Sequence, residues 1–139
     1  MLECLILGDS IAKGIAKQRP ECVQVAQVGA TSQQFKYEVI NQPDVFKPGY
    51  RTVVISLGTN DNAYDLTTSY LSMLRGSIKA DKVMWILPGV KHAYARDAVR
   101  LLADSYHDSI IEIPDKMLGP DHTHPTAAGY KSLAEQTKK

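Results

Sequence analysis

Ser10 is the first residue of this 139-residue sequence whose type and position could support catalysis. It follows the apolar segment 2–7 and Gly8, and it opens a segment with helical periodicity. A hydroxyl at the start of a helix is exposed to the positive end of the helix dipole, where backbone N–H groups can bind a developing oxyanion. Ser and Asp are also ordinary helix caps, so the Gly8-Asp9-Ser10 triplet alone is a weak signal.

A second cluster, Asp121 and His124, lies just before the last segment with helical periodicity. Three residues apart in a tight turn, the carboxylate can bind the imidazole Nδ1 and fix its tautomer. The Nε2 atom is then left to accept the proton of a serine hydroxyl. The alternative is a capping Asp beside a solvated loop His.

The same cluster has a competing interpretation as a metal site, because His122 and His124 form a His-x-His pair beside Asp121. A catalytic zinc ion needs three protein ligands and an open position. The remaining histidines, His92 and His107, have no ligand spacing, so we predict no metal.

Two further loops offer hydrogen-bond donors. Gly29 follows the apolar segment 23–28, and its lack of a side chain would let a substrate oxygen approach the backbone N–H. Asn60 follows segment 52–57 and carries an amide donor. Both residues are also common in turns. With the N–H of Ser10 they could supply three donors around one developing oxyanion.

Short apolar segments alternate with amphipathic ones along the chain, a pattern typical of a parallel sheet flanked by helices. We predict strands over 2–7, 23–28, 52–57, 83–87 and 109–113, and helices over 11–17, 31–40, 69–79, 93–106 and 126–136. The carboxyl ends of parallel strands share one edge of the sheet, where α/β proteins place their sites. We therefore predict an α/β fold, one domain over residues 1–139, with the polar clusters at that edge.

Composition excludes several classes of function. The net charge is +1 and no basic cluster stands out, which argues against nucleic-acid binding. No segment reaches the roughly 20 apolar residues of a transmembrane helix, and the N-terminus does not have the pattern of a signal peptide. We expect a cytoplasmic location. Cys4 and Cys22 match no zinc or redox spacing, so we interpret them as reduced core residues.

Taken together, the four ordered clusters resemble those of the SGNH, or GDSL-like, hydrolases. They read Gly8-Asp9-Ser10, Gly29, Gly58-Thr59-Asn60-Asp61 and Asp121-His122-Thr123-His124-Pro125, and they span most of the chain.

The resemblance implies a flavodoxin-like, three-layer α/β/α fold with a five-stranded, mostly parallel sheet. It implies ester hydrolysis with Ser10 as nucleophile, His124 as base and Asp121 as its orienting acid. Ser10, Gly29 and Asn60 would form the oxyanion hole. His124 is preferred to His122 because the family pattern is Asp-x-x-His. No metal or organic cofactor is implied.

The chain departs from the pattern in having Ile11 where the family has Leu, and in its short length without a lid insertion. We therefore expect an open, shallow site and short acyl groups, such as acetyl, on a small ester or an acylated carbohydrate. Asp9 and three residues of loop 88–94, Lys91, His92 and Tyr94, are candidates for lining the substrate; the loop residues could instead be merely solvated.

Two other functions remain open at this point. A non-catalytic module could use the same cleft to hold a glycan, since fold does not fix function. An acyltransferase would use the same acyl-enzyme with a different acceptor.

Overall fold

A computed structural model describes residues 1–62 and 66–139 of the chain. Its centre is a five-stranded sheet in the order β2-β1-β3-β4-β5, and every pair of neighbouring strands is parallel. The strands are β1 Leu2–Gly8, β2 Val23–Ala26, β3 Gly49–Ser56, β4 Lys79–Ile86 and β5 Ser109–Ile111. The predicted α/β fold class with five strands is confirmed.

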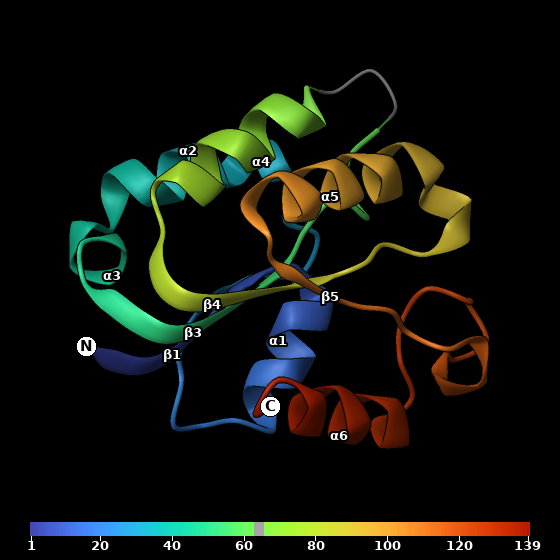
Figure 1. Cartoon of the computed structure of the whole chain (residues 1–139). Helices are drawn as coiled ribbons and strands as arrows, with labels where there is room; N and C mark the ends of the chain where they lie inside the picture. The colour runs from blue at the N-terminus through green and yellow to red at the C-terminus, as the bar shows by residue number, and fades with distance from the viewer. Residues whose placement is uncertain (63–65) are drawn as a thin grey trace.

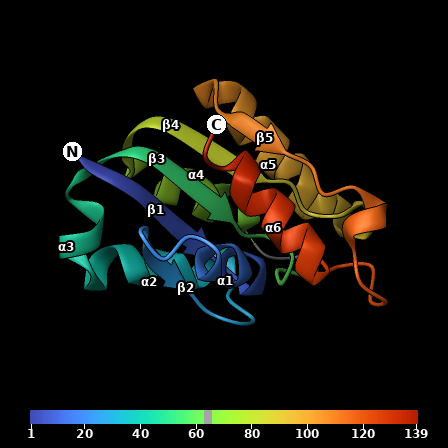
Figure 2. The same ribbon diagram turned by 90° about the horizontal axis from the view of Figure 1, so that it is seen from below.

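Helices cover both faces of the sheet and make three layers (Figures 1 and 2). One face carries α1 Ser10–Lys17 and α6 Ala127–Gln136; the other carries α2 Ser32–Asn41, α3 Pro43–Phe46, α4 Thr67–Gly76 and α5 Ala93–Tyr106. Two short 3₁₀ helices, η1 Val90–His92 and η2 Asp115–Met117, lie in the loops after β4 and β5. None of the helices formed by residues 1–62 and 66–139 has the length and apolar character needed to cross a bilayer.

The layers follow from the alternation of side chains along each strand. In β1, Leu5 and Leu7 belong to the core under α2, α4 and α5, whereas Cys4 and Ile6 belong to the core against α1 and α6. Both sets are buried, which is why the central strands read as continuous apolar segments.

The fourth strand is longer than predicted. Helix α4 ends at Gly76 instead of residue 79, and β4 begins at Lys79 instead of residue 83. Residues 79–82 are mostly charged and exposed or half-buried, so apolar patterning does not reveal them, but their backbone pairs with β3 from Gly49 onwards. Helix α3 was not predicted either, because four residues are too few to show a helical period.

The prediction of reduced cysteines is wrong: Cys4 and Cys22 form a disulfide. The register of β1 and β2 pairs Leu5 with Val23. Cys4 and Cys22 directly precede these two residues, so they lie side by side. Their Cα atoms are 4.8 Å apart and both side chains are buried. The crosslink closes a loop that contains α1 and Ser10.

Candidate active site

Ser10 is placed by a tight turn at the end of β1. Gly8 has φ +141°, and a Cβ atom there would lie 1.9 Å from the carbonyl oxygen of Ser56, so the turn requires glycine. Asp9 then caps α1, with its Oδ1 accepting hydrogen bonds from the N–H groups of Ile11 (3.0 Å) and Ala12 (3.4 Å). Ser10 thus becomes the first residue of the helix, half-buried at the carboxyl edge of the sheet.

The side chain of Asp9 lies beneath the site instead of lining it. It is only 1% exposed, and its Oδ1 also accepts a hydrogen bond from the hydroxyl of Ser56 (3.0 Å). Its Oδ2 is buried with no hydrogen-bond partner among the described residues. Burial raises the pKa of Asp9 to about 6, against the opposing effect of its hydrogen bonds. The predicted contact of Asp9 with substrate is therefore replaced by a structural role under Ser10.

Ser10, His124 and Asp121 form a continuous chain of hydrogen bonds. The Ser10 Oγ lies 2.8 Å from His124 Nε2, and His124 Nδ1 lies 2.6 Å from Asp121 Oδ2. The bond from the His124 ring, together with backbone N–H bonds, holds the pKa of Asp121 well below its usual range. Asp121 therefore stays ionised beside the ring near neutral pH. A Ser-His-Asp arrangement of this kind can deprotonate the hydroxyl during attack on a carbonyl carbon.

The loop before α6 fixes the orientation of His124. The N–H groups of Thr123 (3.0 Å) and His124 (2.9 Å) donate to Asp121 Oδ1, so one carboxylate holds both the backbone and the ring. The Gly119 N–H donates to the His124 carbonyl (2.7 Å), which closes the loop on itself.

His122 occupies a different position in this loop. It has φ +55°, a left-handed conformation, and its side chain lines the neighbouring pocket. Both ring nitrogens of His124 are engaged, by Ser10 and by Asp121, so that ring has no nitrogen left for an ion in this arrangement. In the described part of the chain, the group with metal-ligand proximity is Cys4, Glu21 and Cys22, where the disulfide occupies both sulfur atoms.

Two of the predicted donors, Gly29 and Asn60, lie in loops that a hydrogen bond joins. Gly29 is exposed and has φ +79°, and apart from its chain neighbours no atom lies within 4 Å of a Cβ built on it, so the space where a side chain would lie is open. The side-chain amide of Asn60 donates to the carbonyl of Ala30 (3.1 Å) and so is tied to the loop that carries Gly29. An amide has two N–H groups, and the second can serve a ligand.

Asp61 holds these two loops together, a role that sequence reasoning missed. Its Oδ1 accepts the N–H of Ser32 (2.9 Å), and its Oδ2 accepts the hydroxyls of Ser32 and of Thr67 (2.7 Å for Thr67). The start of α2, the loop after β3 and the start of α4 thus share one carboxylate. The signal available in the sequence was that Asp61 directly follows Asn60.

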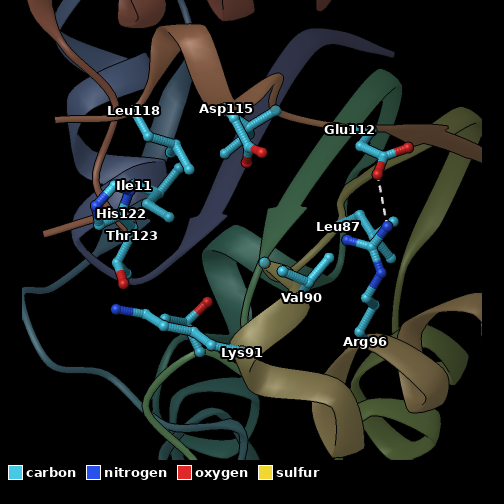
Figure 3. Close-up of a pocket in the computed structure, with 13 residues that line it drawn as sticks. Ile11, Leu87, Val90, Lys91, Arg96, Glu112, Asp115, Leu118, His122 and Thr123 are labelled. Atoms are coloured by element: carbon cyan, nitrogen blue, oxygen red, sulfur yellow. Dashed lines mark hydrogen bonds and ion pairs between the residues drawn. The ribbon is translucent and has the colours of Figure 1, made fainter.

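A cavity of about 400 Å³ is lined in part by Ile11 and Thr123, which directly adjoin Ser10 and His124 in the chain (Figure 3). Ile11, His122 and Thr123 form its near end, and an ion pair between Arg96 and Glu112 lies at its far end. The other lining residues come from the loops after β3, β4 and β5: Thr59, Leu87, Gly89, Val90, Lys91, Ile113, Asp115 and Leu118.

Of the loop residues predicted to line substrate, Lys91 is on the cavity wall. Its Nζ donates to the backbone carbonyl of Asp121 across the cavity (2.7 Å). The structure does not place His92 and Tyr94 among the described residues that line the cavity. His92 is half-buried, and burial together with the charge of Lys91 lowers its pKa.

No protein-family model and no curated protein sequence matches this chain. Solved structures do match it. A GDSL-like lipase from Bacteroides thetaiotaomicron superimposes over 98% of this chain and 85% of that one, with a TM-score of 0.73 and 19% sequence identity. The chain has the SGNH (GDSL-like) hydrolase fold.

Two further structures with this fold are similar to the chain. The catalytic domain of peptidoglycan O-acetyltransferase A from Streptococcus pneumoniae matches over 96% of this chain and 89% of that one, with a TM-score of 0.67 and 19% identity. A two-domain esterase active on acetylated mannans matches over 99% of this chain, with a TM-score of 0.66 and 18% identity. This chain spans 48% of that esterase.

Proposed function

We propose that this chain is a serine esterase that removes short acyl groups, such as acetyl, through an acyl-enzyme on Ser10. The observation that carries the proposal is the 2.8 Å contact between Ser10 Oγ and His124 Nε2, at the carboxyl edge of a sheet with the SGNH hydrolase fold. A nucleophile and a base within hydrogen-bond reach, with a third group orienting the base, are the signature of nucleophilic catalysis.

In the first step, His124 Nε2 takes the proton of Ser10 as Oγ bonds to the ester carbonyl carbon. The carbonyl electron pair moves to its oxygen, which becomes an oxyanion. The N–H groups of Ser10 and Gly29 and the side-chain amide of Asn60 are its proposed donors. Asp121 stabilises the imidazolium that forms, because its Oδ2 lies 2.6 Å from His124 Nδ1.

In the second step, the oxyanion collapses, the ester C–O bond breaks and His124 gives its proton to the leaving alcohol oxygen. The acyl group is now on Ser10. Water then adds to the acyl carbon while His124 takes one of its protons, and the acid leaves as Ser10 recovers its hydrogen. The protons balance over the cycle, and no cofactor is needed.

The acyl carrier proposed here is a small ester or an acylated carbohydrate. Two of the similar structures are named for a peptidoglycan O-acetyltransferase and for an esterase active on acetylated mannans, which supports acetyl transfer from or to sugars. A transferase would use the same acyl-enzyme and pass the acyl group to a sugar hydroxyl. Adding unacylated sugar during turnover separates the two, since a transferase forms acylated sugar in place of free acid.

The disulfide is relevant to the cellular compartment in which the protein works. Disulfides persist in oxidising compartments and are rare in the reducing cytoplasm. We therefore propose that the chain works in an oxidising compartment, in place of the cytoplasmic location expected from its sequence. Thiol counting on protein isolated under alkylating conditions tests this, since a working form with two free thiols contradicts it.

Ser10→Ala tests the central claim. The variant is expected to lose hydrolysis of p-nitrophenyl acetate and labelling by a fluorophosphonate probe, while its far-UV spectrum and melting temperature stay close to those of the wild type. An active or labelled Ser10→Ala protein would refute the assignment.

His124→Ala and His122→Ala form a matched pair in one loop. The first should remove activity, because it deletes the base. The second should keep most of the activity on p-nitrophenyl acetate, because the imidazole within hydrogen-bond reach of Ser10 Oγ is that of His124. The reverse result would exchange their proposed roles.

A further inference from the structure

The cavity lined by Ile11 and Thr123 is larger than a short acyl group requires. An acetyl group has three non-hydrogen atoms, whereas a volume of about 400 Å³ lies within the range of roughly 300–1,000 Å³ typical of small-molecule pockets. If the acyl group is short, another part of the substrate must occupy this space.

The position of the cavity favours the alcohol half of the ester. The cavity is lined by residues of the loops after β3, β4 and β5, whereas Gly29 follows β2, the outer strand on the other side of the sheet from β5. The leaving oxygen must meet His124 Nε2 to receive its proton. His122 and Thr123, the two residues before His124 in the chain, form part of the cavity wall (Figure 3).

The charged residues that line the cavity indicate which kind of ligand it favours. Lys91 and Arg96 are balanced by Glu112 and Asp115, so the lining favours neither an anion nor a cation. A long alkyl chain would remove water from these groups without offering them hydrogen bonds, which is costly. The lining therefore favours an uncharged occupant that can form hydrogen bonds with these residues.

Apolar contacts are available between the charged residues. Ile11, Val90 and Leu118 line the cavity between the charged groups and the His122 end, and the C–H faces of a sugar ring can pack on them. Glycan hydroxyls both donate and accept hydrogen bonds, so they can accept from Arg and donate to carboxylate side chains.

The far end is preorganised for such hydroxyls. The Arg96 guanidinium donates to the Pro88 carbonyl (2.9 Å) and to Glu112 Oε1 (2.5 Å), so its plane is fixed. The hydrogen bond from Arg96 lowers the pKa of Glu112 and keeps it ionised. A carboxylate has about four acceptor positions, so Glu112 can accept a hydroxyl while it remains bound to Arg96.

We propose that this cavity binds one neutral sugar ring of the alcohol half of the ester, with Arg96, Glu112 and Asp115 as specificity determinants. This inference rests on the esterase function proposed above and adds the substrate class and the residues that select it.

The kinetic test compares monoacetylated methyl glucoside, methyl mannoside and methyl N-acetylglucosaminide with p-nitrophenyl acetate. Glu112→Ala should lower the ratio of kcat/KM for the preferred sugar ester to that for p-nitrophenyl acetate by about tenfold, as expected for lost hydrogen bonds to a charged group. Asp115→Ala should lower it in the same direction. Glu112 is largely exposed, so its removal should leave the fold intact.

Glu135→Ala is the matched control. Glu135 also forms an exposed ion pair, with Lys138, but it lies in α6 and does not line the cavity. Its removal should leave the ratio unchanged. The proposal is overturned if the ratio is unchanged in both Glu112→Ala and Asp115→Ala. It is also overturned if the wild type prefers p-nitrophenyl octanoate to the acetate by about tenfold or more, since the cavity would then hold the acyl chain.

A binding measurement separates this inference from the catalytic one. Saturation-transfer NMR on Ser10→Ala with the three unacylated methyl glycosides should detect binding that Glu112→Ala, added to the same variant, weakens. If wild type hydrolyses p-nitrophenyl acetate but no glycoside binds, the sugar site is overturned and the esterase stands. If a glycoside binds but wild type neither hydrolyses the ester nor reacts with the fluorophosphonate probe, the esterase is overturned and the sugar site stands.

Discussion

Asp61 accepts hydrogen bonds from both the N–H and the hydroxyl of Ser32, a residue 29 positions earlier in the chain. The contact joins the loop that carries Gly29 to the loop that carries Asn60. These two proposed oxyanion donors therefore depend on one carboxylate that itself contacts no reacting atom in the proposed mechanism.

Asp61→Ala should lower kcat for p-nitrophenyl acetate by about tenfold, with a smaller change in KM. The physical reason is that the donors remain but are less well placed; deleting a donor outright costs about 10²–10³. Loss of the carboxylate also leaves the Ser32 N–H without this partner, so kinetics should be measured well below the melting temperature.

Asp81→Ala serves as the comparison, because Asp81 is exposed in the first half of β4, away from the carboxyl edge of the sheet. Its kcat should match that of the wild type. A positioning role for Asp61 is contradicted if both variants turn over at the wild-type rate.

Asp9 predicts a specific dependence of stability on pH. Its pKa is raised from 3.8 to about 6, so the folded protein retains a proton between these values that the unfolded chain releases. The stabilising contribution is complete below about pH 4 and is lost as the pH rises through 6. Its size is on the order of 3 kcal/mol, since one pKa unit is about 1.4 kcal/mol.

Asp9→Asn removes this titration and retains a side chain that caps helices well. The free energy of unfolding, from urea titrations at pH 4.5, 6 and 7.5, should therefore fall less with pH in Asp9→Asn than in the wild type. Asp81→Asn, at an exposed position, should reproduce the wild-type slope. Parallel slopes for all three proteins would exclude a raised pKa at Asp9.

The sequence was informative where chemistry and apolar patterning coincide. The ends of β1, β2 and β3 follow apolar segments, so the positions of Ser10, Gly29 and Asn60 at one edge could be predicted. The first half of β4 could not, because its charged residues join the sheet through their backbone. The disulfide depends on the register between β1 and β2, and burial of Asp9 depends on Ser56, 47 residues away. Neither relationship has a local pattern in the sequence.

Reduction of the Cys4–Cys22 disulfide should destabilise the protein. The two residues are 18 positions apart, and closing a loop of this length stabilises a fold by about 3 kcal/mol in the chain-entropy treatment. We expect dithiothreitol to lower the urea midpoint of the wild type accordingly. In the double variant Cys4→Ala, Cys22→Ala, the midpoint should already be low and should not respond to dithiothreitol. A wild-type midpoint that is insensitive to dithiothreitol, with two thiols titratable in the unfolded protein beforehand, contradicts the crosslink.

Lys91 reaches across the cavity to the backbone carbonyl of Asp121, and this contact predicts a positioning role. Lys91→Met keeps much of the apolar stem but removes the donor, so the loop that carries Asp121 and His124 loses its link to η1. A hydrogen bond from a charged group contributes about 1.5–3 kcal/mol. Lys91 is exposed, so we expect a contribution below that range, and therefore about a three- to tenfold fall in kcat/KM. Lys91→Arg, which can still donate to the carbonyl, should recover most of the activity, and Lys131→Met, an exposed substitution in α6, should have no effect. If Lys91→Arg is as impaired as Lys91→Met, the hydrogen bond to Asp121 is not what matters at this position.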